Sequence, residues 1–138
     1  MDDGDPGFSA RGGPFTFSPE GMFEDMLWAP AALQETSAEA EWRYPFATCG
    51  RYLLEVYLPP SQGVSQAALY QVGHRSGMAS RLVDQSAYQG KWVSLGEFEF
   101  LPNGGSFLRL ANATGEDPAL GLRLLFDAVR WTLLGPCR

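Results

Sequence analysis

The stretch that decides the fold is RYLLEVYL, residues 51–58. Every second side chain in it is apolar or aromatic, namely Tyr52, Leu54, Val56 and Leu58. This alternation is typical of a β-strand that buries one face. Pro59 and Pro60 follow at once, and proline cannot donate a ladder hydrogen bond. The stretch therefore predicts one half-buried strand that ends before Pro59.

Similar alternation recurs on both sides of this stretch. Strands are predicted over residues 36–43, 51–58, 68–74, 78–85, 92–100 and 106–111. In the first of them Ala38, Ala40 and Trp42 form a dry face. Asn103-Gly104-Gly105 predicts a hairpin turn before the last strand. Strands and turns at this spacing favour an antiparallel sandwich or barrel over βαβ units.

Two regions do not follow the simple strand pattern. Residues 19–27 are predicted to form a short helix, because Ser18 and Pro19 suit a helix cap and first turn. Residues 117–134 fit two readings equally well. The Asp117-Pro118 opening suits a capped helix, whereas the alternation around Phe126 suits a strand that is buried on both faces.

Composition limits the classes of partner. The chain has 138 residues, which fits a single domain over residues 1–138. Its hydrophobic fraction is 45% and its charged fraction 19%, so it is expected to fold around a core. The formal net charge is −6 with no basic cluster, which argues against nucleic acid as a partner. The most apolar stretch contains charges and is too short to insert into a membrane.

The chain has two cysteines, Cys49 and Cys137. Each is expected at the end of a strand, and strand ends can be neighbours in a sandwich. The two residues can therefore form a disulfide or remain reduced, and the pattern does not choose between these states. Two thiols alone do not make a zinc site, and no metal site is predicted.

Five pieces of the chain, in order, carry a family resemblance. They are residues 50–52 with the strand that ends at Pro59-Pro60, residues 68–74 with Gly77, and residues 83–85, 90–96 and 127–131. Together they resemble the golvesin C-terminal-like domain, a carbohydrate-binding-like domain of xanthan lyase, over about residues 5–134. The resemblance implies an antiparallel β-sandwich of jelly-roll type and makes the C-terminal segment a strand. It also implies a module appended to secreted or cell-surface proteins beside catalytic domains.

Aromatic residues near predicted loops are the candidate sugar platforms, because sugar rings dock on aromatic faces while amides grip hydroxyls. The candidate carbohydrate-binding residues are Trp28, Tyr88, Gln85, Gln89 and Trp92. A packing role at the edge of the sandwich is the alternative for each aromatic ring, and Trp92 is expected to pack beneath its turn.

No catalytic residues are predicted. His74 is the sole histidine and shares a face with Tyr70 and Val72, so a structural role is expected. Asp127 alternates along the chain with Val129 and Trp131, so it is expected on the same buried face and is also expected to be structural. No cofactor is predicted, although structural calcium is not excluded.

The leading hypothesis is a non-catalytic, extracellular accessory domain of a larger parent protein that binds a polysaccharide or cell-wall glycan. The rival hypothesis is a structural or self-associating interaction module without a sugar site.

Overall fold

The computed structural model describes residues 8–12, 16–18, 26–32, 38–44, 46–59, 63–87, 90–102, 106–117 and 120–137. These residues form eleven β-strands and no α-helix, so the predicted all-β class is confirmed. The strands are β1 (Phe8–Gly12), β2 (Thr16–Ser18), β3 (Met26–Pro30), β4 (Ala38–Trp42), β5 (Gly50–Leu58), β6 (Ala68–His74), β7 (Gly77–Val83), β8 (Lys91–Phe100), β9 (Phe107–Ala111), β10 (Arg123–Phe126) and β11 (Val129–Pro136). Within these ranges no helix is long and apolar enough to cross a membrane.

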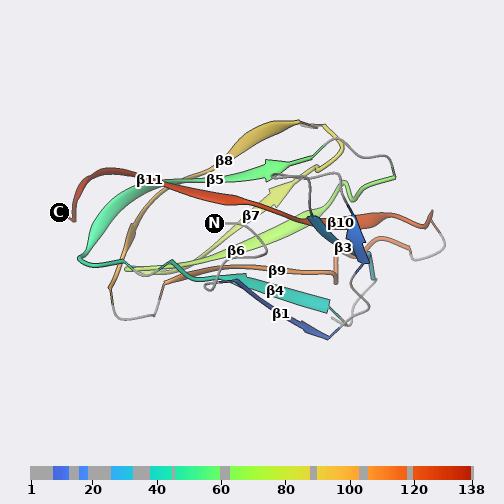
Figure 1. The fold of residues 1–138 in the computed structure, drawn as a ribbon, viewed down its shortest axis with the longest axis horizontal. Helices are drawn as coiled ribbons and strands as arrows, with labels where there is room; N and C mark the ends of the chain where they lie inside the picture. Colours follow the sequence, from blue (N-terminus) through green and yellow to red (C-terminus); the bar gives the residue numbers. More distant parts are fainter. Residues whose placement is uncertain are drawn as a thin grey trace.

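The strands form two stacked layers (Figure 1). One layer is the five-stranded sheet β1-β4-β9-β6-β7, and the other contains the sheets β11-β5-β8 and β10-β3-β2. Only Asp127 and Ala128 separate β10 from β11, and the Tyr57 N–H donates to the Ala128 carbonyl at 2.9 Å. The two small sheets therefore continue one another. The strand pairings are antiparallel, which confirms the predicted antiparallel β-sandwich.

The core fills the space between the layers. Strand β5 lies between β11 and β8, and its residues Leu54, Val56 and Leu58 are buried, as their alternation predicts. Trp42 reaches from the five-stranded sheet to the opposite layer. Its indole N–H donates to the Asp127 carbonyl at 3.1 Å, and its ring lies 6.4 Å from that of Phe126. Alternation along each strand thus supplies one apolar face to a shared interior.

One local expectation is tested only at its end, and another is wrong. The predicted helix over residues 19–27 ends in Met26 and Leu27, which belong to strand β3 instead, while residues 19–25 lie outside the described residues. The predicted hairpin at residues 103–105 does not pair its flanking strands. Strand β8 pairs with β5 and strand β9 pairs with β4 and β6, so the chain crosses between layers here. The C-terminal segment forms strands β10 and β11, as the family resemblance implies.

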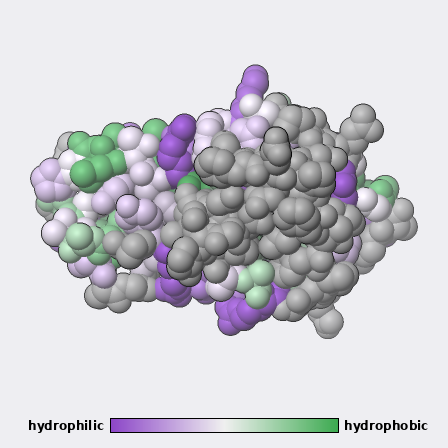
Figure 2. All heavy atoms as spheres, viewed as in Figure 1, coloured by the Kyte–Doolittle hydropathy of each residue, from purple (hydrophilic) through white to green (hydrophobic). Residues whose placement is uncertain are grey.

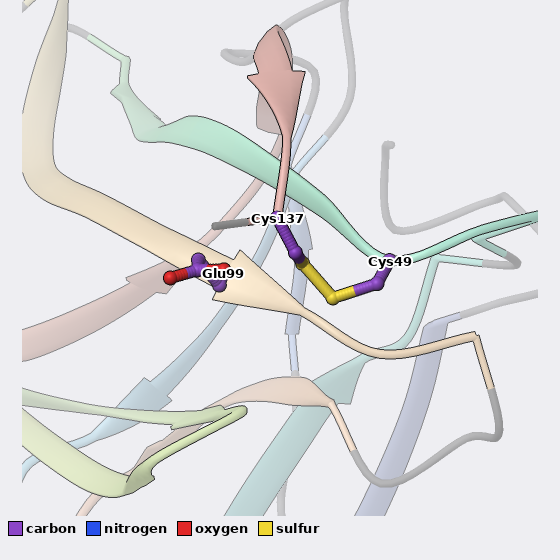
Figure 3. A group of neighbouring side chains, drawn as sticks. All are labelled: Cys49, Glu99 and Cys137. Atoms are coloured by element: carbon purple, nitrogen blue, oxygen red, sulfur yellow. A yellow bond between two sulfur atoms is a disulfide. The ribbon is translucent and has the colours of Figure 1, made fainter.

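A disulfide joins Cys49 to Cys137 across the ends of two paired strands (Figure 3). The antiparallel register places Gly50 of β5 opposite Pro136 of β11, so the neighbouring cysteines have Cα atoms 5.5 Å apart. This separation lies within the usual range for disulfides. The structure thus resolves the alternative that the strand pattern left open.

Paired charges cover part of the outer face of the five-stranded sheet. Arg109 donates to Glu41 at 2.7 Å, and Arg43 donates to the other oxygen of Glu41 at 3.0 Å. Burial on its own would raise the pKa of Glu41, but the hydrogen bonds and charges of the two arginines outweigh it and hold the pKa below its ordinary value. The folded state therefore favours the ionised carboxylate.

Acidification is expected to remove the stabilisation that Glu41 contributes. Because its folded pKa lies below the ordinary value of 4.5, this stabilisation is present above pH 4.5 and is lost as the pH falls through the folded pKa. Glu41→Gln should lower the free energy of unfolding by roughly 1–2 kcal/mol at pH 7. Urea unfolding of both proteins at pH 7 and pH 3 measures the effect. An equal difference at both pH values would contradict the prediction.

Candidate ligand-binding site

Of the predicted sugar-binding residues, the structure describes the side chains of Trp92 and Gln85 only. Trp28 lies in strand β3, but its side chain is outside the described part of the molecule, and Tyr88 and Gln89 are wholly outside it. Trp92 lies on the outer face of strand β8, whereas Gln85 lies in the interior. The structure therefore separates these two residues.

Gln85 has a structural role, contrary to the expectation that it contacts a ligand. Its side chain is 0% exposed. The amide nitrogen donates to the Leu125 carbonyl and to the Tyr70 hydroxyl, both at 3.1 Å, and the amide oxygen accepts from the Leu125 N–H at 3.0 Å. Leu125 belongs to β10, an edge strand of its sheet. The amide thus occupies backbone groups that would otherwise be unpaired at a buried edge.

An aromatic pair with an adjacent arginine forms one outward-facing cluster among the described residues. The register places Trp92 of β8 opposite Tyr57 of β5, and their ring centroids are 5.4 Å apart. The guanidinium of Arg130 on β11 lies 4.2 Å from the Trp92 ring centroid and pairs with Glu55 at 2.9 Å. Cation–π contact and the ion pair both restrict the arginine. We call Tyr57, Trp92 and Arg130, with Glu55, the aromatic platform.

Strand alternation explains why these side chains face outward. Tyr57 lies between the buried residues Val56 and Leu58, and Arg130 follows the buried residue Val129. Trp92 is partly exposed. The platform therefore combines a partly exposed aromatic surface with charged groups that can bind hydroxyls.

A groove lies at the open edge between the two layers, where strands β7 and β8 approach. Its volume is about 500 Å³, and its lining includes Arg81, Asp84, Ala87 and Ser94. Arg81 spans this edge, since its Nε donates to the Leu95 carbonyl at 2.9 Å. Ala87 in this lining precedes the predicted site residues Tyr88 and Gln89 in the sequence.

The structure places His74 at the end of β6 and Asp127 between β10 and β11. The Nδ1 atom of His74 accepts from the backbone N–H of Ser76 at 3.3 Å, and its ring lies 5.0 Å from that of Phe98. Asp127 is buried, and its backbone carbonyl accepts the Trp42 indole N–H. Burial and the charge of Asp127 raise the pKa of Tyr70, against the lowering effect of its hydrogen bond with Gln85. Tyr70 therefore stays protonated in the folded protein.

One group of potential metal ligands occurs among the described residues, namely Cys49, Glu99 and Cys137. Figure 3 shows the two cysteines joined to each other, with Glu99 on the neighbouring strand β8. A disulfide has no thiolate to offer, and the thiolate is the form of cysteine that binds metals. This group therefore does not form a metal centre while the disulfide is intact.

Sequence reasoning missed Tyr57 and Arg130 as members of the site. Both lie within predicted strands, whereas the predicted sugar platforms are aromatic residues near loops. The available signal was strand alternation. Tyr57 lies two residues after Glu55 and so faces outward with it, and Arg130 lies opposite Glu55 on the paired strand. Their proximity to Trp92 depends on the pairing of β5 with both β8 and β11.

Comparisons with known proteins place this fold. No curated protein matches the chain. Among solved structures, a Paenibacillus xanthan lyase matches with a TM-score of 0.80 and 18% sequence identity, over 96% of this chain. The chain spans only 12% of the length of that lyase chain, so the likeness shows a shared fold. The family model of the Golvesin C-terminal domain matches residues 16–132, and the chain therefore belongs to the Golvesin C-terminal domain family.

Proposed function

We propose that this domain is a non-catalytic accessory module that binds a polysaccharide through the aromatic platform. The observation that carries the proposal is the partly exposed Trp92 ring, which contacts both Tyr57 and Arg130 on an outer sheet face. Aromatic faces suit the C–H-rich sides of sugar rings, and the Arg130–Glu55 pair offers both donors and acceptors to hydroxyls. The predicted residues Trp28, Tyr88 and Gln89 remain proposed contributors to the same function.

The family and the disulfide support the accessory and extracellular parts of the proposal. A domain of this fold occupies a small part of a xanthan lyase chain, as expected of a module carried beside a catalytic unit. Disulfides persist in oxidising environments, and the Cys49–Cys137 bond suits a domain that works outside the cell. Among the described residues, His74 makes a local backbone contact instead of activating a nucleophile, which favours a non-catalytic role.

Trp92→Ala is expected to weaken polysaccharide binding by about tenfold or more, because it removes the ring that both Tyr57 and Arg130 contact. Affinity electrophoresis in gels that contain xanthan, β-glucan or peptidoglycan fragments measures the change in mobility. Tyr57→Ala should act in the same direction. Trp28→Ala, Tyr88→Ala and Gln89→Ala test the remaining candidates.

Tyr44→Ala is the matched control, since Tyr44 is an exposed aromatic residue (45%) outside the platform. Thermal unfolding checks that each variant is folded. If the wild-type domain binds none of these polymers, or if Trp92→Ala and Tyr44→Ala reduce binding equally, the proposed site is wrong.

Self-association is a second candidate function, favoured by a separate surface. Exposed apolar side chains lie toward the disulfide end of the molecule, where Leu133 is 62% and Leu134 42% exposed. Figure 2 shows hydrophobic atoms gathered at the end where β11 terminates. Solvent-exposed apolar clusters often mark interaction surfaces. Sedimentation equilibrium of the wild type and of Leu134→Ser tests this candidate, and a monomer at all concentrations would exclude it.

A further inference from the structure

A second cavity lies toward the opposite end of strand β8 from Trp92. Its volume is about 290 Å³, and its lining residues are Arg51, His74, Ser76, Glu97, Phe98 and Glu99. Arg51 and Tyr57 both occupy outward positions of β5 and are separated by six residues, or roughly 20 Å at the rise of a β-strand. The cavity is therefore a different site from the aromatic platform.

Arg51 is the most informative group in this lining. Its Nε atom is buried, and it has no hydrogen-bond partner among the described residues. An arginine side chain remains charged at any ordinary pH, and a buried donor without an acceptor is costly. Arg51 as a whole is partly exposed and lines the cavity, so a molecule bound there can contact its side chain.

The charges of the lining limit what that molecule can be. Glu99 pairs with Arg75 at 3.0 Å, and Glu97 is exposed beside it on the same strand. Since Arg75 compensates the charge of Glu99, Glu97 is the carboxylate that disfavours an anion, while Arg51 disfavours a cation. A neutral ligand with hydroxyl groups satisfies both conditions, because a hydroxyl accepts from an arginine and donates to a carboxylate.

The apolar part of the lining and the size of the cavity further restrict the class of ligand. The rings of His74 and Phe98 lie 5.0 Å apart and form one wall. Such a wall can contact the C–H groups of a saturated ring. The volume lies just below the range of about 300–1,000 Å³ that is usual for drug-sized ligands, so a smaller molecule fits best.

We infer that this cavity is a second ligand site, which binds one neutral polyhydroxylated ring of the kind found in a single uncharged sugar unit. One hydroxyl oxygen accepts from Arg51, and a neighbouring hydroxyl donates to Glu97. This ligand class follows from the cavity itself, so the inference does not depend on the aromatic platform. The ring can come from a free monosaccharide or from the end of a glycan chain.

The test is a nuclear magnetic resonance titration of the ¹⁵N-labelled protein. The probes are glucose, galactose, mannose and xylose, then cello- and xylo-oligosaccharides, with glucuronate and inorganic phosphate as anions. A neutral sugar is expected to shift the Arg51 Nε–H signal and the backbone signals of His74 and Glu97. Shifts with oligosaccharides alone would assign the site to chain ends, and shifts with monosaccharides would assign it to free sugars.

Three variants test the assignment. Arg51→Met keeps the aliphatic stem but removes the donors, and Glu97→Gln changes an exposed residue that carries little risk to folding. Each should weaken the binding of the neutral sugar by about tenfold. Lys91→Met is the control, because Lys91 is an exposed cation on β8, the strand of Glu97, and lies outside the cavity. This variant should bind the neutral sugar like the wild type.

Failure of this inference can be told apart from failure of the proposed function. If no neutral sugar shifts these signals, or if only glucuronate or phosphate does, the inference is wrong, whatever Trp92→Ala does to polysaccharide binding. If Glu97→Gln binds as tightly as the wild type, the assigned contacts are wrong as well. Conversely, sugar-dependent shifts at Arg51 would support the second site even if the domain bound no polymer through the platform.

Discussion

Reduction of the Cys49–Cys137 disulfide is expected to lower the free energy of unfolding by about 4–5 kcal/mol. The bond closes a long loop, since the two residues are separated by 88 positions in the chain. In the loop-entropy model, removing such a cross-link lets the unfolded chain explore many more conformations. The disulfide also ties the last strand, β11, to the start of the central strand β5.

Urea unfolding with and without a phosphine reductant measures this effect. The Cys49→Ser, Cys137→Ser double variant is the control, because it should show the lowered stability without reductant and no further change with it. The unfolding midpoints are compared together with the denaturant dependence of the free energy of unfolding. This separates a change in stability from a change in the surface exposed on unfolding. A loss below about 1 kcal/mol would contradict the prediction and would mean that the strand ends stay together without the bond.

Gln85→Ala is expected to destabilise the protein by about 2–4 kcal/mol. The variant leaves the Leu125 N–H and carbonyl without the amide at a buried edge, and it removes a partner of the Tyr70 hydroxyl. Burying such groups unpaired costs their full desolvation free energy, and the lost side-chain volume adds to this cost.

Gln66→Ala is the matched control, because Gln66 is exposed and should change stability by no more than about 0.5 kcal/mol. Thermal and urea unfolding compare the two variants. A ligand role for Gln85 predicts the reverse pattern, with normal stability and weakened polysaccharide binding. That pattern would overturn the structural role described above.

The class of the fold follows from the sequence because strand alternation is a local property. The pattern of β5 places Leu54 and Val56 in the core, and both are buried. The C-terminal segment has no clear pattern, because β10 is buried at three consecutive positions and therefore lacks alternation between apolar and polar residues. Family resemblance resolved it, and β10 and β11 confirm that resolution.

Long-range pairing explains the failures. The turn residues 103–105 indicate a reversal of the chain, but local sequence does not say which sheet the next strand joins. Gln85 looks like a surface amide in the sequence. It is buried because β10 presents an open edge to it, and that edge is formed by residues 40 positions further along the chain.

The sequence by itself determined that this protein is a β-sandwich of the golvesin type. Only the tertiary structure decided that Cys49 reaches Cys137, that Trp92 lies against Tyr57 and Arg130, and that Arg51 lines a cavity. The physical reason is that alternation depends on adjacent residues. Each of these sites instead depends on the order and register in which distant strands pair.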